Sequence, residues 1–340
     1  MTSDLRDRLR RTSRLPEGWS EPEVVEDVIV ADGLELRRAG MSSVSPGGEE
    51  IPGAAVELTD SPVPRSYFEL LERISTLDAL RSLPSSCEVR TLDGELAGRR
   101  RAADVFPESD DPARWRYARS NGVALHRDWE TAALRAFWEL SERDRILRAW
   151  YGEISPVRLA FEPGATSLGR TASYEWAAYS FGPSQESVFS RDIQVIGVFG
   201  FPKRSEAPFV CGYAARPDGR HALDAAVAEA LQQLAFLWGE PALERLADPA
   251  PTPMHHLDRL QWPAHHDVLR RWLGGAHMAY RPPAGKTDEA SVGFVDLTPA
   301  WLEGGLRVVK AVCEAATPLA FGDAPFGAHL PAELRVHPIA

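Results

Sequence analysis

The chain has 340 residues, with 38 Lys and Arg against 49 Asp and Glu, which gives a formal net charge of −11 at pH 7. This length fits one large or two ordinary domains, and a hydrophobic content of 44% supplies enough apolar side chains for a buried core. The acidic balance argues against nonspecific nucleic-acid binding, which needs a surplus of cations facing phosphates. No apolar run approaches the ~20 residues of a membrane helix. Three scattered cysteines fit a reducing compartment, and no secretory signal opens the chain, so we expect a cytoplasmic protein.

The first part of the chain contains short strand-like pieces at 24–30 and 34–40 and a Pro- and Gly-rich loop at 42–53. Apolar residues at helical spacing then predict three long helices, over 65–83, 128–150 and 221–238.

Strand-like pieces occupy much of the remaining chain; they lie at 87–92, 114–125, 156–162, 171–181, 192–201, 209–215 and 290–297. The run 305–315 could be strand or helix, and a short helix is expected at 267–273. Strands and helices mix without a strict βαβ rhythm. The pattern therefore predicts an α+β fold with a largely antiparallel sheet and packed helices.

The three long helices share an acidic pattern. Each places a Glu three residues before a second Glu or Gln; the pairs are Glu69 and Glu72, Glu139 and Glu142, and Glu229 and Gln232. Residues three apart share a helix face. Carboxylates beside an apolar stripe are costly to bury unless they are neutralised, and Mg²⁺ prefers such oxygen ligands. The spacing alone leaves two interpretations open, a convergent metal site and solvated salt-bridge faces.

The sequence around these pairs resembles a known family. SYFELLERIS, residues 120–144 and residues 211–233 are similar, in order, to three blocks of the YcaO superfamily, and the resemblance covers about residues 60–340. It implies a YcaO-like fold in which 61–340 form an ATP-binding catalytic domain and 1–60 an N-terminal segment. It also implies an ATP site without a P-loop, and the chain contains no G-x-x-x-x-G-K-[ST].

The resemblance also implies roles for individual residues. The positions expected to hold Mg²⁺ on the ATP phosphates are Glu69, Glu72, Glu139, Glu142 and Glu229. The positions expected to contact the nucleotide are Ser66, Arg73, Ser120, Arg143 and Gln232. The planar guanidinium of arginine suits phosphate oxygens, although an intrahelical pair with a nearby carboxylate is an alternative use of both arginines.

Members of this family use ATP to phosphorylate a peptide-bond oxygen after a nucleophile has added to the carbonyl carbon. The resemblance therefore implies a cyclodehydratase that forms azoline rings in a ribosomally made precursor peptide, with ATP and Mg²⁺ as cofactors. Because no separate leader-binding domain is recognisable, a ThiF-like or other leader-recognition protein is expected as a partner. Amidine or thioamide formation and a non-catalytic scaffold subunit are the alternatives.

Several positions depart from the family pattern. His126 replaces a glycine, Phe236 replaces an arginine, and the end of the chain keeps only His337-Pro338 of a proline-rich tail. These departures leave the catalytic base unassigned.

We expect no metal-binding role for the two histidine pairs and a structural role for the cysteines. His255-His256 and His265-His266 match no zinc-site spacing, and we expect them in a surface or peptide-contacting loop. Cys87, Cys211 and Cys313 are expected to be small core residues.

Overall fold

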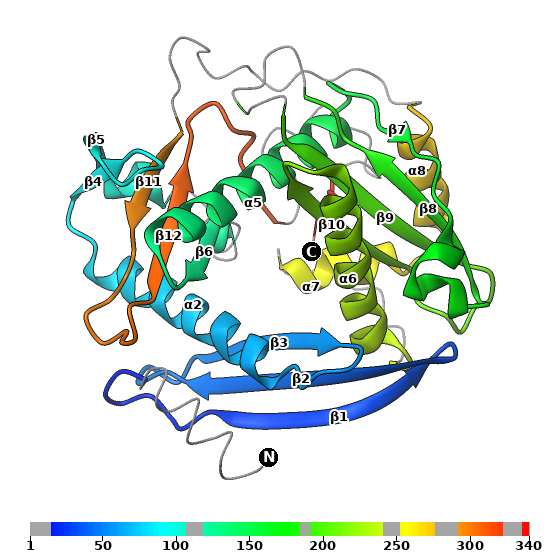
Figure 1. Ribbon diagram of the computed structural model, residues 1–340, viewed down its shortest axis with the longest axis horizontal. Coiled ribbons are helices and arrows are strands. Elements are labelled where there is room, and N and C mark those ends of the chain that lie inside the picture. The colour runs from blue at the N-terminus through cyan, green and yellow to red at the C-terminus, as the bar shows by residue number, and fades with distance from the viewer. Residues whose placement is uncertain are drawn as a thin grey trace. The chain divides into compact units, whose positions relative to one another are not determined.

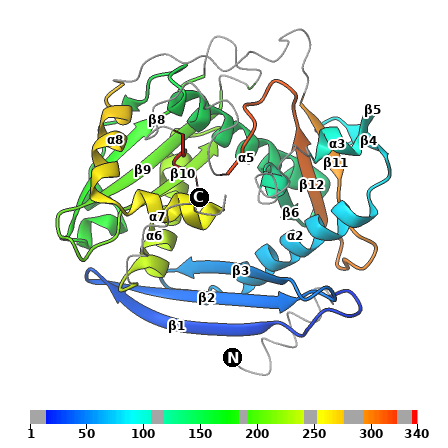
Figure 2. The same ribbon diagram turned by 180° about the vertical axis from the view of Figure 1, so that it is seen from behind.

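A computed structural model describes residues 15–106, 118–183, 189, 192–240, 252–275, 292–321 and 335–339. The chain divides into two compact units. Unit 1 comprises Met1–Phe106, Gly122–Phe137 and Val292–Val312, and unit 2 comprises Pro107–Asn121, Trp138–Ser291 and Cys313–Ala340. Both units combine helices with antiparallel sheets, which confirms the expected α+β class (Figures 1 and 2). Among the described residues, no helix has the length and apolar character needed to cross a membrane.

Unit 1 begins with a three-stranded antiparallel sheet, in the order β1 (Glu23–Ala31), β2 (Leu34–Val44) and β3 (Glu50–Glu57). Helix α2 (Val63–Ser82) packs against β2 and β3. Its buried apolar side chains include Tyr67, Leu70, Leu71 and Ile74. The turn Asp32-Gly33 has positive φ at both residues, 46° and 85°, which suits a two-residue hairpin between twisted strands. The loop expected over 42–53 is therefore shorter, because 42–44 and 50–53 pair as strands.

A second, five-stranded sheet completes unit 1, in the order β5-β4-β11-β12-β6. Its strands are β4 (Ser86–Arg90), β5 (Leu96–Arg101), β6 (Val123–His126), β11 (Gly293–Asp296) and β12 (Arg307–Val312), and the short helix α3 (Ala102–Val105) follows β5. The ambiguous run 305–315 thus contains a strand, which is buried at every position after Arg307.

Unit 2 contains a four-stranded antiparallel sheet in the order β10-β9-β8-β7. Its strands are β7 (Val157–Arg158), β8 (Tyr174–Ser180), β9 (Gln194–Pro202) and β10 (Val210–Arg216), and its helices include α6 (Gly219–Leu237), α7 (Pro253–Leu260) and α8 (Pro263–Leu273). Helix α6 packs on β10 and β9. Aromatic rings fill part of the core; Trp272 of α8 stacks on Phe181 at 5.5 Å and meets Trp150 edge-on at 5.1 Å.

Helix α5 (Trp129–Trp150) contributes to both units, since the division falls between Phe137 and Trp138. The three long helices predicted from the sequence are confirmed, and their ends agree with α2, α5 and α6 to within two residues. Their acidic pairs therefore lie on real helices, which is the condition for a shared face.

Candidate active site

The two glutamates of α2 are held by backbone N–H groups of edge strands. Ala54 N–H, on β3, donates to Glu69 Oε2 at 2.9 Å, and Leu125 N–H, on β6, donates to Glu72 Oε2 at 2.8 Å. A hydrogen bond to one carboxylate oxygen orients the side chain. Both predicted metal ligands in unit 1 are thus fixed in direction by the strands beside the helix.

Helix α2 approaches β3 unusually closely. A Cβ added at Gly53 would lie 2.3 Å from Ser66 O and 2.7 Å from Leu70 N, so only glycine fits there. The predicted nucleotide contact Ser66 is fully buried and donates its hydroxyl to Val63 O at 2.9 Å. This hydroxyl could therefore accept a hydrogen bond from a nucleotide, and it could donate one only if the bond to Val63 O broke.

Arg73, the predicted nucleotide contact in the same helix, has two neighbours in unit 1. Its guanidinium pairs with Glu69 one turn earlier and also donates to Pro52 O at 3.1 Å. The intrahelical pair, the alternative raised by the sequence, is therefore present. Arg73 remains half-exposed, with 44% of its side chain accessible.

Helix α6 repeats the arrangement of α2. Tyr213 N–H, on β10, donates to Glu229 Oε2 at 2.7 Å, and a Cβ at Gly212 would lie 2.2 Å from Ala226 O. Gln233 extends the contact by accepting Cys211 N–H at 2.9 Å. In both α2 and α6, a strand glycine precedes the residue whose N–H holds the glutamate, and a small residue lies three positions before that glutamate.

Helix α5 carries the remaining predicted ligands. Arg143 pairs with Glu139 at 2.7 Å and donates to Asn121 Oδ1 at 3.2 Å. Asn121 directly follows a 3₁₀ turn that ends at the predicted nucleotide contact Ser120. The beginning and the end of the second sequence block thus meet at α5 within unit 2.

The acidic groups of unit 2 interact strongly. Burial, the nearby Glu229 and then Glu139 raise the pKa of Glu142 to about 8, and the Arg143 cation only partly opposes them. Burial likewise raises the pKa of Glu229 to about 7, against the opposing effect of the Tyr213 N–H bond. Protein atoms surround the Glu229 carboxylate closely enough to raise its pKa, and the residue still keeps solvent-exposed surface.

The arginines near Glu142 and Glu229 offset only part of the rise in the pKa values of these two glutamates. Arg143 and Arg216 both lower the pKa values of Glu142 and Glu229, yet those values stay raised. Carboxylates are suitable ligands for Mg²⁺, and the neighbouring arginines are suitable partners for the phosphates of a nucleotide bound to that ion. In the part of the chain that the structure describes, no three His, Cys, Asp or Glu side chains form a ready-made metal site. Phosphate and water oxygens would therefore have to supply part of the coordination.

The predicted positions fall into two groups. Glu69, Glu72, Ser66 and Arg73 lie in unit 1, and Glu139, Glu142, Glu229, Ser120, Arg143 and Gln232 lie in unit 2. Within unit 2 the structure brings the glutamates of α5 and α6 together. Gln232 lies on α6 beside Gln233, the residue that bonds β10.

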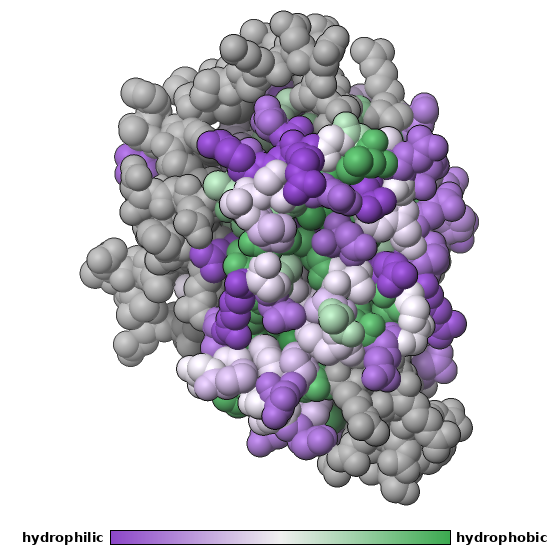
Figure 3. Space-filling view, turned by 90° about the vertical axis from the view of Figure 1, so that its left-hand side faces the viewer, coloured by the Kyte–Doolittle hydropathy of each residue, from purple (hydrophilic) through white to green (hydrophobic). Residues whose placement is uncertain are grey.

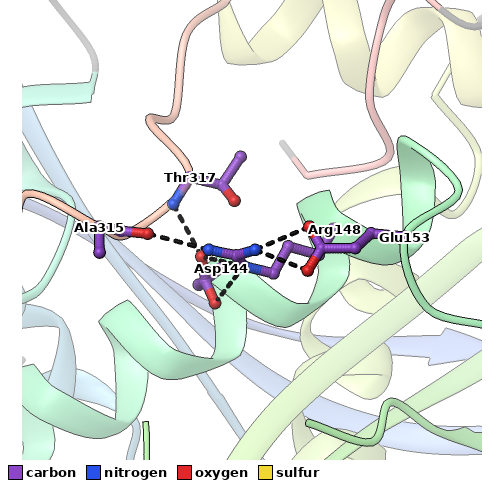
Figure 4. Close-up of polar contacts among 5 residues, drawn as sticks. All are labelled: Asp144, Arg148, Glu153, Ala315 and Thr317. Carbon is purple, nitrogen blue, oxygen red and sulfur yellow. Dashed lines mark hydrogen bonds and ion pairs between the residues drawn. The ribbon is translucent and has the colours of Figure 1, made fainter. Parts of the chain in front are cut away.

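A buried network of ion pairs lies just after the site residues of α5, and the sequence did not predict it. Asp144 pairs with Arg148 at 3.0 Å, and Arg148 pairs with Glu153 at 2.7 Å (Figure 4). Thr317 N–H donates to Asp144 Oδ1 at 2.7 Å and Arg148 donates to Ala315 O at 2.9 Å. The network ties residues 315–317 to the helix that carries Glu139 and Glu142. An aspartate directly after Glu-Arg was a visible signal, although its partner 173 positions away was not.

The chain end keeps its His-Pro pair in the interior of unit 2. His337 Nε2 donates to Ala320 O at 2.8 Å, and its carbonyl accepts from His256 Nδ1 at 3.0 Å. Tyr213 O–H donates to Pro338 O at 3.5 Å. Burial lowers the pKa of His337 to about 4, and the Arg143 cation contributes to the shift.

The histidine pairs do not form the surface loop expected from the sequence. His255 and His256 lie on α7 and His265 and His266 on α8, and only His255 is not buried. Proline at the first position of each helix and the Thr252 cap of α7 explain why these segments are helical. Of the cysteines expected in the core, Cys87 and Cys211 are buried and Cys313 is half-buried.

Comparison with known families decides the assignment. Residues 101–315 match the sequence model of the family described as YcaO cyclodehydratase, ATP- and Mg²⁺-binding. The chain belongs to the YcaO family. ATP and Mg²⁺ are the cofactors of this family, as the resemblance implied. Among curated proteins, no sequence matches the chain significantly.

Solved structures share the fold of this YcaO protein. A YcaO structure from Methanopyrus kandleri bound with AMPPCP and Mg²⁺ has a TM-score of 0.56 and 18% identity, over 94% of this chain and 92% of that one. A chain of the E. coli microcin synthetase McbBCD complex scores 0.57 at 11% identity, over 93% and 96%. A heterocyclase in complex with substrate and cofactor scores 0.54 at 16% identity, and the match spans 92% of this chain and 52% of the heterocyclase. At these identities the likeness concerns the fold alone.

Proposed function

We propose that this YcaO protein is an ATP- and Mg²⁺-dependent cyclodehydratase that forms azoline rings in a ribosomally made precursor peptide. The observation that carries the proposal is the carboxylate cluster of Glu139, Glu142 and Glu229. Burial, and to a smaller extent the neighbouring glutamates, raise the pKa values of Glu142 and Glu229, and Mg²⁺ beside them would favour their ionised forms. The heterocyclase that shares the fold supports a heterocycle as the product.

Within this proposal, the residues of the chain bind and orient the nucleotide. Glu69, Glu72, Glu139, Glu142 and Glu229 would hold Mg²⁺, and the metal would offset charge on the phosphates. The backbone bonds to Glu69, Glu72 and Glu229 fix one oxygen of each carboxylate and so reduce the reorganisation needed on binding. Ser66, Arg73, Ser120, Arg143 and Gln232 are the proposed nucleotide contacts.

The proposed reaction can be tested by following the amide oxygen of the peptide. A Cys, Ser or Thr side chain adds to the preceding amide carbon, the amide oxygen takes the γ-phosphoryl group of ATP, and phosphate leaves with that oxygen. The peptide therefore loses one water for each ring. We would incubate the protein with ATP, Mg²⁺ and a peptide carrying ¹⁸O in one amide. Mass spectrometry should find water loss in the peptide and the label in phosphate, and neither in a Glu229→Gln variant.

One observation favours a second product class. The tail keeps His337-Pro338 but lacks the outer prolines typical of azoline-forming members. In amidine or thioamide formation the same activation step precedes attack by an amine or a sulfur donor. Label in phosphate with exchange of oxygen for sulfur in the peptide would select thioamide formation. Label in phosphate with the bond formed at an amine instead of a Cys, Ser or Thr side chain, located by tandem mass spectrometry, would select amidine formation. A protein that binds no nucleotide would be a scaffold subunit.

A separate leader-recognition protein, ThiF-like or otherwise, is the partner we propose. The McbBCD structure is a complex, which supports an assembly for a protein of this fold. Full activity of the isolated chain on a complete precursor peptide would contradict this part of the proposal.

A further inference from the structure

Strand β5 forms one edge of the five-stranded sheet in unit 1. Among the described residues it pairs only with β4, whereas β6 forms the opposite edge. Every residue of β5 except Arg100 is exposed, and Leu96 has 62% of its surface accessible. An exposed edge strand presents backbone N–H and C=O groups that an extended peptide can pair with.

The charge of this edge is opposite to that of the chain. Strands β4 and β5 together contain four arginines and one glutamate, in a protein with a net charge of −11. Arg101 pairs with Asp104 while 78% of its side chain remains accessible, and Arg99 donates to Ser86. Figure 3 faces the side on which β4 and β5 lie, and the described residues there are mostly hydrophilic with small hydrophobic patches.

We propose that β5 is a docking strand for an acidic, extended segment of the precursor peptide. The register shift between Val89 and Arg90 puts Leu96, Arg99 and Arg101 on one face of the sheet, and alternate residues of a docked segment would place carboxylates opposite Arg99 and Arg101. The identity of the occupant as substrate rests on the proposed function; the affinity of the strand for acidic peptides does not.

The sheet itself relates this edge to the acidic helix α2. Four strand spacings of ~4.8 Å separate β5 from β6, or roughly 19 Å. Strand β6 carries Leu125, whose N–H holds Glu72. An extended linker of about six residues, at ~3.3 Å each, spans that distance. A docked segment therefore leaves a following part of the same peptide free to reach the Glu72 end of the sheet.

Edge arginines also serve a different purpose in many proteins, because charge on an edge strand prevents aggregation. That role requires no ligand. It predicts that charge removal lowers solubility and that acidic peptides do not bind.

The test measures peptide binding without ATP, by fluorescence anisotropy. The probe is a short labelled peptide of alternating valine and glutamate, compared with its valine–lysine counterpart. Variants are Arg99→Glu/Arg101→Glu, the milder Arg99→Gln/Arg101→Gln, and the control Arg220→Glu/Arg271→Glu, which makes the same charge change at exposed sites in unit 2. Circular dichroism and gel filtration check the fold of each variant.

We expect the Val–Glu probe to bind, to weaken with added salt, and to lose at least tenfold in affinity with the Glu variant and less with the Gln variant. The control variant should bind like the wild type, and the Val–Lys probe should not bind. Absence of binding, equal losses in both Glu variants, or aggregation of the β5 variants without any peptide binding by the wild type would overturn the proposal. Since no nucleotide is present, none of these results depends on whether the chain is a cyclodehydratase.

Discussion

Glu142 and Glu229 give the free protein a titration that ordinary glutamates lack. Their raised pKa values, about 8 and about 7, mean that the folded state keeps protons which the unfolded chain releases near pH 4.5. Because the native state then binds more protons, the free energy of unfolding falls as pH rises from about 4.5 to about 8. Bound Mg²⁺ would remove this penalty by favouring the ionised carboxylates.

We predict that Glu142→Gln changes this dependence. In the absence of Mg²⁺, the variant should gain stability relative to the wild type as pH rises from 5 to 9, since an amide never ionises. Urea unfolding in a chelator at several pH values measures the difference, with Glu35→Gln at an exposed position of β2 as the control. A stability difference that does not change with pH would contradict the pKa assignment.

Asp144 is a buried carboxylate that pairs with Arg148 and accepts a hydrogen bond from Thr317 N–H. Asp144→Asn would keep an acceptor for Thr317 N–H and remove one of the two carboxylates that face the buried Arg148. We expect a loss of about 2–4 kcal/mol in unfolding free energy, because a buried pair that loses one partner leaves a charge poorly compensated. Chemical denaturation measures it. In the exposed pair Arg220–Asp224, Asp224→Asn should cost less than about 1 kcal/mol, and equal losses at the two sites would contradict the buried-network account.

At the scale of elements, the contact of a strand glycine with a helix sets the position of each glutamate. Gly212→Ala would push a methyl group against backbone atoms of α6, 2.2 Å from Ala226 O and 2.4 Å from Ala230 N. We predict a destabilisation of about 1–3 kcal/mol and, because Tyr213 N–H moves away from Glu229, weaker Mg·ATP binding. Thermal unfolding and titration calorimetry measure the two effects. Gly40→Ala, which meets nothing within 4 Å, should leave both unchanged, and a neutral Gly212→Ala would contradict the close approach.

The sequence predicted the elements whose pattern of apolar residues lies within one short segment of the chain. Apolar spacing located α2, α5 and α6, because apolar residues recur at helical spacing in each, although α5 is buried on all sides from Asp144 to Trp150. The extent of pairing between β2 and β3 escaped prediction, since Pro52 and Gly53 there resemble loop residues and only the register with α2 and β2 explains them. Helix α7 was missed, and the short helix predicted over 267–273 covers only the later part of α8, because Pro263 resembles a loop residue and the buried His256 hydrogen-bonds a backbone carbonyl 81 positions away.

The candidate site was predictable in residue type and only partly in geometry. Repeated Glu-x-x-Glu spacing pointed to the acidic helices, and the family match explains that pattern. The contacts of Glu229 with Tyr213 and of Arg143 with Asn121 join residues 16 and 22 positions apart, so no helical or strand periodicity reveals them. Ser66 shows the converse, since a motif position predicted to contact nucleotide has its hydroxyl bonded inside its own helix.

At the scale of the whole molecule, each of the two units of this YcaO protein contains an acidic helix whose glutamate accepts a backbone N–H of an edge strand. Unit 1 contributes α2 and unit 2 contributes α6, while α5 runs through both. If all three helices serve Mg·ATP, one substitution in either unit should lower the affinity for nucleotide.

The most direct test is isothermal titration of the protein with ATP, with and without Mg²⁺. Variants Glu69→Ala, Glu139→Ala and Glu229→Ala each remove one proposed ligand from one helix, and Glu35→Ala on β2 is the control. The account predicts Mg²⁺-dependent binding by the wild type and the control, and at least a tenfold loss in each of the three variants. Unchanged Mg·ATP affinity in all three folded variants, or no binding by the folded wild type, would contradict the assignment of these glutamates to the nucleotide site.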